Sequence, residues 1–278
     1  MRRRLVFAFP RPKVAEGLRF EAFADEVCAL CGFEIEALWT ADHDGLVAAV
    51  CERRAQLAWA PPVPAVELEM RAGAVPLVAV GRDGSTAYHG AMVVLRESPR
   101  QRTVDLAGAR VAWVSKASAA GYLVPRLYLA SKGLDPQTMF SEQRFAGTHE
   151  AALGMLLAGE VDVAACYARV DPRDGSKFEV AVPGNLVRAV AMVGPLPSDV
   201  ITSAGLDLND RAAITRALLG ASEESLQPLR TIANVTRFEP MPFGHLDPVR
   251  KLAAAARGLG VRLPEEIARR VHAGGGIC

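Results

Sequence analysis

The stretch at residues 110–132, RVAWVSKASAAGYLVPRLYLASK, predicts a buried strand, a short polar turn and a helix in direct succession. The strand is the apolar run 111–114, and Ser118 stands where the N-cap of the helix is expected. The first N–H groups of a helix have no partner inside it and lie at its positive end. This helix start is therefore a candidate anion site. The alternative is an ordinary βα corner in which Ser118 only caps the helix.

Strands and helices also alternate on the amino-terminal side of this stretch, judging from apolar runs and the breaks between them. The expected elements, in chain order, are strand 4–10, helix 14–31, strand 33–40, helix 42–54, strand 56–60, helix 64–71 and strand 75–80. This alternation is typical of an α/β protein with a mostly parallel sheet flanked by helices.

Two longer extended runs divide the chain, at 88–96 (YHGAMVVLR) and 186–193 (LVRAVAMV). We expect both to be strands that cross between two α/β lobes. The crossings imply a discontinuous lobe one, residues 1–90 plus 192–278, and a lobe two, residues 91–191. A hinged pair of this kind binds a ligand in its cleft and closes on it.

Charge and hydropathy exclude several classes of partner. The chain has 32 basic and 31 acidic residues, a net charge of +1, and no basic field that would favour nucleic acid. Its apolar runs are short or interrupted, whereas a membrane helix needs about 20 apolar residues. We therefore expect no nucleic acid and no membrane insertion, and a small or specific partner instead.

The amino terminus and the cysteines bear on the cellular compartment. The sequence MRRRLVFAFPRPK is similar to an export signal only briefly, because Pro10 ends the apolar run. We expect either a cytoplasmic protein or one whose export signal is absent from this sequence. Cys28 and Cys31 form a C-x-x-C, but no second pair accompanies them, which favours two helix cysteines over a zinc or redox site. A disulfide framework is not expected.

Motifs of common enzyme classes are missing from the sequence, including G-x-S-x-G, H-E-x-x-H, a phosphate-binding loop and G-x-G-x-x-G. The run Asp42, His43 and Asp44 invites a metal interpretation, but no distant partner motif accompanies it. Asp42 is better explained as a helix N-cap. We expect no metal and no cofactor.

Two segments carry a family resemblance: DLAGARVAWVSKASAAGYLVPRLYLASKGLDP, at 105–136, and FAGTHEAALGMLLAGEVDVAA, at 145–165. Their S-x-x-G-Y-L-x-P run, their G-[ST]-H before a helix and their G-x-V-D-x-A-A strand resemble the phosphonate-binding proteins of ABC transporters. The likeness continues weakly through TADHDGLVAAV and PLPSDVITSAGLDLNDRAAITRALL, so it covers nearly the whole chain. It implies the two-lobed type 2 periplasmic binding fold, with a mixed, mostly parallel sheet in each lobe.

The resemblance also implies a ligand site. In that family a Ser-Thr-Ser-like triplet, the histidine of G-S-H and tyrosines of lobe one hold the anion, while acidic residues hold an ammonium group. Carried over to this sequence, the ligand-binding residues are Ser118, Ala119 and Ala120 for the triplet, Thr148 and His149 for the G-[ST]-H, Tyr88 and His43 for the tyrosines, and Arg169 and Asp199 near the acids.

Departures from the family pattern change the expected ligand. Only Ser118 keeps a hydroxyl of the triplet, and a hydrogen bond to a charged group is worth about 1.5–3 kcal/mol. Arg169 in place of an acid repels an ammonium group and suits a planar carboxylate. We expect a phosphonate- or phosphate-like anion or, given these changes, a carboxylate with an apolar or aromatic body near Trp39, Trp59 or Tyr122.

The sequence thus predicts a monomeric solute-binding protein that closes around a small anion for ABC-type uptake. Its partners would be that anion and an ABC permease, and its location would be periplasmic or extracellular. Two alternatives are a cytoplasmic enzyme and a ligand sensor, both built on the same fold.

Overall fold

The computed structural model describes residues 3–10, 25, 27, 29–116, 118–171, 174, 178–183 and 185–251. The chain divides into two compact units. Unit 1 comprises Met1–Thr86 and Pro197–Asp247, and unit 2 comprises Ala87–Leu196 with Pro248–Cys278. The expected helix 14–31 lies mostly outside the described residues, as does Cys28, although residues 29–31 are helical.

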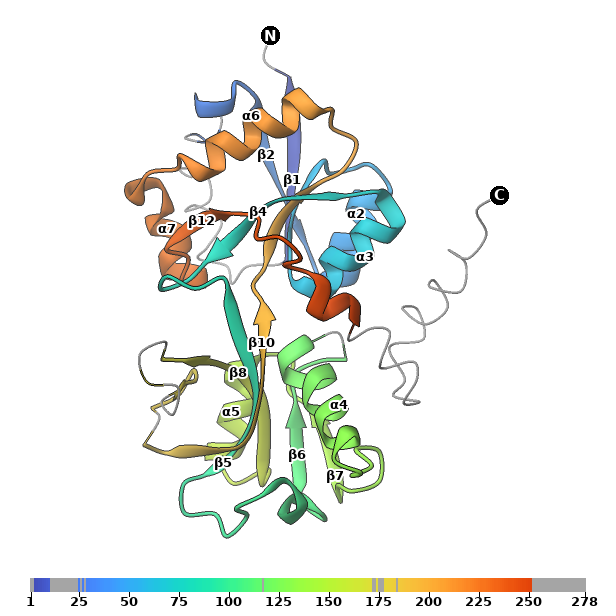
Figure 1. Cartoon of the computed structure of the whole chain (residues 1–278), viewed down its shortest axis with the longest axis vertical. Coiled ribbons are helices and arrows are strands. Elements are labelled where there is room, and N and C mark those ends of the chain that lie inside the picture. The colour runs from blue at the N-terminus through green and yellow to red at the C-terminus, as the bar shows by residue number, and fades with distance from the viewer. Residues whose placement is uncertain are drawn as a thin grey trace, which may run out of the picture. The chain divides into compact units, whose positions relative to one another are not determined.

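Unit 1 is built on one mixed sheet with the strand order β12-β4-β11-β3-β1-β2 (Figure 1). Its strands are β1 (Arg4–Pro10), β2 (Glu34–Thr40), β3 (Leu57–Ala60), β4 (Val75–Gly81), β11 (Val200–Ser203) and β12 (Arg237–Pro240). Strand β1 is parallel to β2 and β3, whereas β11 and β12 are antiparallel to their neighbours.

Helices cover the sheet of unit 1 because each has an apolar face. They are α2 (His43–Cys51), α3 (Pro62–Ala72), α6 (Leu208–Leu219) and α7 (Glu223–Ala233). Ile214 and Leu218 of α6 and Leu226 and Leu229 of α7 join a buried core with side chains of the sheet. Figure 1 shows α2 and α3 together, away from α6.

Unit 2 is built on a second mixed sheet with the order β10-β5-β8-β6-β7, and β9 pairs with β8. Its elements are β5 (Ala87–Leu95), η1 (Thr103–Leu106), β6 (Arg110–Trp113), η2 (Ala119–Leu123), α4 (Val124–Ser131), β7 (Glu142–Phe145), α5 (His149–Leu157), β8 (Val163–Val170), β9 (Phe178–Glu179) and β10 (Val187–Pro197). Strand β6 is parallel to β7 and β8, and β5 is antiparallel to β8.

The two faces of this second sheet are covered differently, as alternation along β6 requires. Ala112 and Val114 point to α5, where they pack against Leu153 and Leu156. Trp113 points to the other face, where it packs edge to face on Tyr122 of η2 and lies against Arg126 of α4. Because η2 follows β6 directly in the chain, it starts at the edge of the sheet where the parallel strands β6, β7 and β8 end.

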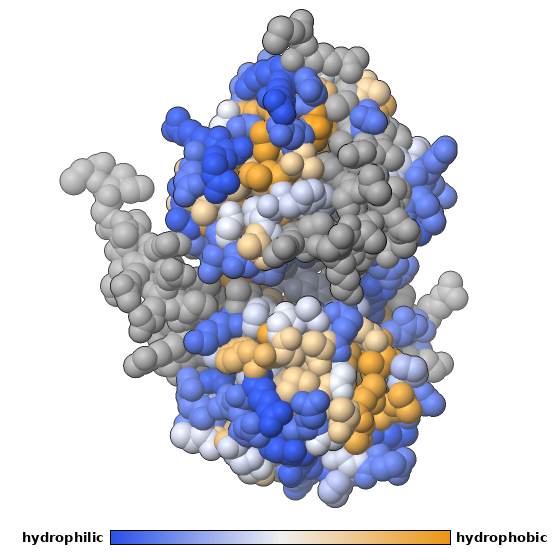
Figure 2. All heavy atoms as spheres, turned by 180° about the vertical axis from the view of Figure 1, so that it is seen from behind, coloured by the Kyte–Doolittle hydropathy of each residue, from blue (hydrophilic) through white to orange (hydrophobic). Residues whose placement is uncertain are grey.

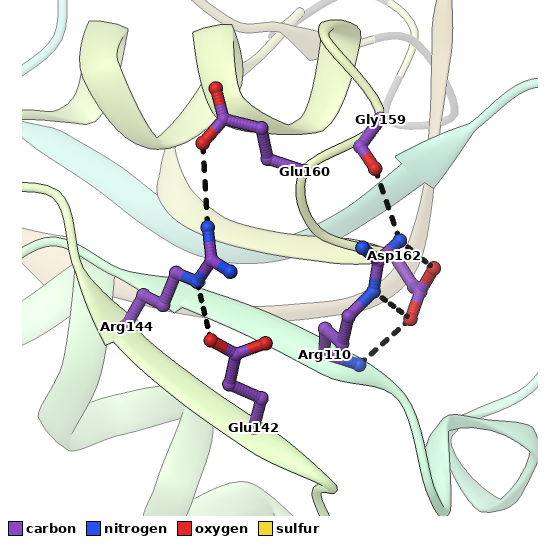
Figure 3. A network of polar contacts seen from close by, with 6 residues as sticks. All are labelled: Arg110, Glu142, Arg144, Gly159, Glu160 and Asp162. Carbon is purple, nitrogen blue, oxygen red and sulfur yellow. Dashed lines mark hydrogen bonds and ion pairs between the residues drawn. The ribbon is translucent and has the colours of Figure 1, made fainter.

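Ion pairs join the amino ends of the same strands, at the opposite edge (Figure 3). The Arg110 guanidinium donates to the Asp162 carboxylate at 2.9 and 3.2 Å, and Arg144 bridges Glu142 at 2.6 Å and Glu160 at 3.4 Å. These pairs are partly exposed, so each contributes about 0–1 kcal/mol. They link the amino-terminal ends of β6, β7 and β8 to one another, and none of them lies at the carboxyl ends of these strands.

The mixed α/β class and the flanked sheets were predicted correctly, and the expected strands of the first eighty residues are present. The sheet of unit 1 is mixed but not mostly parallel, because β11 and β12 add antiparallel pairings. Strands β11 and β12 were missed. The four residues of β11 are all buried, and β12 ends at a proline, so neither shows the alternation that marks a half-buried strand. The first helical turn after β6, Ala119–Leu123, is π-helical, where an α-helix was expected.

Candidate functional site

The site begins at the carboxyl ends of β6 and β7, where hydrogen bonds join the segments that lead into two helices. The Ala146 N–H donates to the Trp113 carbonyl at 2.8 Å, and the Gly147 N–H donates to the Val114 carbonyl at 2.9 Å. These bonds join the segments that follow the two strands. In open α/β sheets this edge is where ligands bind.

Ser118 caps the first of these helix starts, as predicted. Its hydroxyl oxygen accepts from the Gly121 N–H at 3.0 Å. A hydroxyl can accept and donate at once, so the cap leaves the hydroxyl hydrogen for a ligand. The N–H groups of Ala119 and Ala120 stand in the first turn, where a helix offers no acceptor of its own.

Gly121 holds this turn against the strand. A Cβ added there would lie 2.3 Å from Val114 Cγ2 and 2.9 Å from Ser118 Oγ. The Val114 N–H donates to the Gly121 carbonyl at 3.1 Å. The other side of the turn meets β5, because a Cβ on Gly90 would lie 3.2 Å from the Ala120 carbonyl oxygen. Because Gly121 and Gly90 have no side chains, the turn capped by Ser118 can lie close to both β6 and β5.

Thr148 and His149 form the second helix start. The Thr148 hydroxyl accepts from the Ala151 N–H at 3.1 Å, so Thr148, expected from the sequence as a ligand-binding residue, is also the N-cap of α5. His149 Nδ1 accepts from the Tyr167 N–H at 3.1 Å, and the two rings pack edge to face with centroids 4.9 Å apart. Because Nδ1 is the acceptor, the ring proton lies on Nε2, which makes Nε2 a donor.

Tyr88 and Arg169 belong to neighbouring strands of unit 2. Tyr88 is the second residue of β5, and Arg169 is near the end of β8, opposite Glu179 of β9. Since β5 and β8 are antiparallel, with His89 opposite Ala168, both residues lie toward the edge where β8 ends. Both are half-buried. Of the predicted site residues, only His43 and Asp199 belong to unit 1.

Asp199 stands at the carboxyl edge of the sheet of unit 1, just before β11. Its carboxylate accepts from Trp59 Nε1 at 3.1 Å and from Arg82 Nη2 at 2.7 Å. About a fifth of each side chain of the ion pair is exposed, 21% for Arg82 and 20% for Asp199. An ammonium group of a ligand would have to compete with this arginine for the carboxylate.

His43 begins α2, directly after Asp42, which caps that helix by accepting from the Gly45 N–H at 2.8 Å, as predicted. Burial lowers the pKa of His43 below its usual value, more than Asp199 and Asp42 raise it. Burial likewise lowers the pKa of His245, against the opposing effects of the Ser198 carbonyl and Asp199. The edge of unit 1 therefore combines one compensated ion pair with two histidines biased toward their neutral form.

Aromatic residues named from the sequence differ in their exposure. Trp59 and Tyr122 are buried, at 6% and 8% exposure, and Trp39 is 36% exposed. The Phe9 ring lies 5.1 Å from Trp39 and 6.3 Å from Trp59. Only Trp39 of the three presents substantial aromatic surface.

Arg126 and Arg82 were missed by sequence reasoning. The Arg126 guanidinium is 1% exposed and lies 4.9 Å from the Tyr122 ring centroid. Its Nη1 donates to the Pro136 carbonyl at 2.9 Å and to Gln143 Oε1 at 3.1 Å. Burial lowers its pKa, but an arginine stays charged. The sequence signal for Arg126 was its position as the one charged residue in the apolar segment 122–129, which is typical of a buried, paired charge.

Other chemistry finds little support among the described residues. None of their His, Cys, Asp and Glu side chains gather into groups of three that could hold a metal ion. Burial raises the pKa of the Cys166 thiol to about 12, so this cysteine is a poor nucleophile. No helix within the described ranges is long and apolar enough to span a membrane.

Two α/β units with capped helix starts at a sheet edge are typical of two-domain substrate-binding proteins. Comparison with known families agrees, because the model of the periplasmic substrate-binding protein of phosphonate ABC transporters matches residues 10–242. The chain belongs to this family, which confirms the resemblance found in the sequence.

Several solved structures share the type 2 periplasmic binding fold with this chain. A binding protein component of an ABC phosphonate transporter from Pseudomonas aeruginosa is 18% identical, covers 98% of both chains and has a TM-score of 0.71. PhnD1 from Prochlorococcus marinus, in complex with methylphosphonate, is 15% identical over 93% of this chain and 98% of its own, with a TM-score of 0.72. The aliphatic sulphonate binding protein SsuA from Escherichia coli is 17% identical over 98% and 84%, with a TM-score of 0.55.

Proposed function

We propose that this substrate-binding protein holds a small anion at the carboxyl edge of unit 2, between its two capped helix starts. The observation that carries the proposal is the bond from the Gly147 N–H to the Val114 carbonyl, which joins the segments leading into the two helix starts. Hydroxyls of Ser118 and Thr148, Nε2 of His149 and the first N–H groups of both helices would be the donors.

The proposed donors are neutral and are held in place by the fold. None of the three side chains is a charged group that would need a permanent counter-ion. Each is fixed by a backbone hydrogen bond before any ligand arrives, so little ordering entropy is lost on binding. Membership of a transport substrate-binding family supports binding over catalysis, and delivery to an ABC permease from a periplasmic position is the role we propose.

The ligand we propose is an anion without an ammonium group. Asp199, near an expected ammonium-binding acid, accepts from both Arg82 and Trp59. Arg169, which stands near the position of the family's other ammonium-binding acid, is itself a cation and would repel an ammonium group. PhnD1 of Prochlorococcus marinus binds methylphosphonate, so phosphonates and carboxylates are the first ligands to test. Lobe boundaries at residues 90 and 192, closure on the ligand and a monomeric state remain predictions.

A thermal-shift screen followed by calorimetry tests the proposal. The panel contains phosphate, methylphosphonate, 2-aminoethylphosphonate, and aliphatic and aromatic carboxylates. A ligand at about 100 times its dissociation constant stabilises the folded protein by roughly 2.7 kcal/mol. We expect stabilisation by a phosphonate or carboxylate and less by the ammonium-bearing compound. Absence of stabilisation by every anion would refute the proposed function.

A matched pair of cap variants locates the site. Ser118→Ala removes a cap and a proposed ligand donor, whereas Ser222→Ala removes a cap of the same kind, the Ser222 hydroxyl that accepts from the Ser225 N–H at 3.2 Å in α7. Both should lose about 1 kcal/mol of stability. Only Ser118→Ala should weaken anion binding, by about tenfold. Equal affinities in the two variants would move the site away from η2.

A further inference from the structure

Phe145, the last residue of β7, is a large apolar side chain that is 48% exposed. It stands three residues before Thr148, the cap of α5. Other exposed apolar side chains occur on both units, among hydrophilic ones (Figure 2). Among those of the described residues in unit 2, Phe145 is the one next to a proposed anion-binding segment. An exposed ring beside a polar site is a common feature of ligand recognition.

A buried aromatic base supports the Phe145 ring. The Phe145 ring packs on the Tyr122 ring with centroids 5.4 Å apart, and the Tyr122 ring packs edge to face on Trp113 with centroids 5.6 Å apart. Arg126 lies against both of these rings, 4.9 Å from Tyr122 and 5.7 Å from Trp113. Because Trp113 and Arg126 are fully buried, the base is fixed by the core. Phe145 therefore presents an ordered ring surface.

The ring is also connected to the segments that carry the proposed donors. Tyr122 belongs to the π-helical turn that Ser118 caps. The N–H of Ala146, the residue after Phe145, donates to the Trp113 carbonyl at 2.8 Å. An anion held by the Ser118 hydroxyl and the first N–H groups would thus have an aromatic face beside it. Its substituent would remove apolar area of Phe145 from water.

We propose that Phe145, seated on Tyr122, is the specificity-determining residue for the substituent of the bound anion. It selects a phosphonate or carboxylate that carries an aromatic or bulky apolar body over one that carries a methyl group or none. This inference rests on the proposed function, and it adds the class of body that the ligand carries.

Calorimetry with two pairs of probes tests this specificity: methylphosphonate with phenylphosphonate, and acetate with benzoate. We expect the wild-type protein to bind the phenyl member of at least one pair about tenfold more tightly. Phe145→Ala should abolish that preference by weakening the phenyl member about tenfold, with a much smaller change for the methyl member. Phe145→Leu, which keeps apolar volume without a flat ring, should retain part of the preference and guards against a folding defect in the alanine variant.

Phe243→Ala is the matched control, because Phe243 is a fully exposed phenylalanine in unit 1. It should leave all four affinities unchanged. Equal weakening of methyl and phenyl ligands by Phe145→Ala would mean that Phe145 only supports the site, and no weakening would mean that it does not meet the ligand. Either result overturns the inference and leaves the proposed function standing. Failure of every anion to bind the wild-type protein would overturn both.

Discussion

The carboxyl edges of the two sheets are equipped in different ways. In unit 2 the edge carries neutral donors, the hydroxyls of Ser118 and Thr148, each already fixed by a backbone N–H. In unit 1 the edge carries charge, with the Asp199 carboxylate paired to Arg82 at 2.7 Å. Similar positions in two α/β sheets thus hold helix-start dipoles in unit 2, with the Arg169 guanidinium toward the same edge, and a compensated ion pair in unit 1.

This difference has a thermodynamic meaning. Burying a charge costs free energy that its partner must offset, so an ion pair such as Asp199–Arg82 has little electrostatic attraction left for a ligand. Helix starts and hydroxyls attract an anion without burying a counter-charge, because their dipoles are oriented by the fold itself. Anion affinity should therefore depend on unit 2 and be less sensitive to the ion pair of unit 1.

Gly121→Ala should have the largest effect, because it disrupts the capped turn of unit 2. The new Cβ would lie 2.3 Å from Val114 Cγ2 and 2.6 Å from its Cβ, so strand and turn must separate. Overpacking of this kind costs about 1–3 kcal/mol. Urea unfolding should show that loss, and anion titration should show a loss of binding.

Gly154→Ala is the control for that variant. Gly154 lies inside α5, where a Cβ would meet no heavy atom within 4 Å. Alanine in a helix interior should stabilise the protein by about 0.5–1 kcal/mol. If the two glycine variants had the same stability, the close packing of η2 on β6 would be wrong.

Asp199→Asn tests the edge of unit 1. The partly exposed pair with Arg82 should be worth about 1 kcal/mol at most, so we expect a modest loss in urea unfolding and no loss of anion affinity. Glu67→Gln, which breaks the ion pair with Arg71 at 2.8 Å on α3, is the control for a general charge effect. A fall in affinity as large as that of Ser118→Ala would contradict the comparison between the two edges.

The pH dependence of stability should show the smallest effect. Burial lowers the folded-state pKa of His43 and His245 below the ordinary histidine value of 6.5, so the unfolded chain binds protons at a higher pH than the folded one. Their contribution is therefore present above about pH 6.5 and is lost as the pH falls below it. Urea unfolding at pH 7.5 and pH 5.5 should show a smaller drop for His245→Gln than for wild type. An unchanged drop would exclude His245 from this dependence.

Local features of the site were predictable from the sequence. The caps Ser118, Thr148 and Asp42 each accept a hydrogen bond from an N–H three residues ahead, so their signal lies within one helical turn. The strand at residues 111–114 and the alternation in the first eighty residues follow from the placement of apolar side chains. These features depend on neighbours in the chain, which a sequence displays directly.

Long-range partners could not be predicted in this way. Asp199 meets Arg82 and Trp59 across 117 and 140 residues of chain, and the meeting depends on the register of β11 between β3 and β4. The sequence offered Asp199 only as an expected ligand residue near a family acid. Its pairing with Arg82 changes the ligand that unit 1 would accept.

The sequence by itself determined the α/β class, the family and the capped helix starts, because these are encoded in local patterns of polarity and turn residues. Only the tertiary structure decided that Asp199 is compensated, that Arg126 is buried beneath Tyr122, and that Phe145 presents an exposed ring beside the caps. The physical reason is that charge compensation and exposure depend on which distant side chains fill the space around a residue.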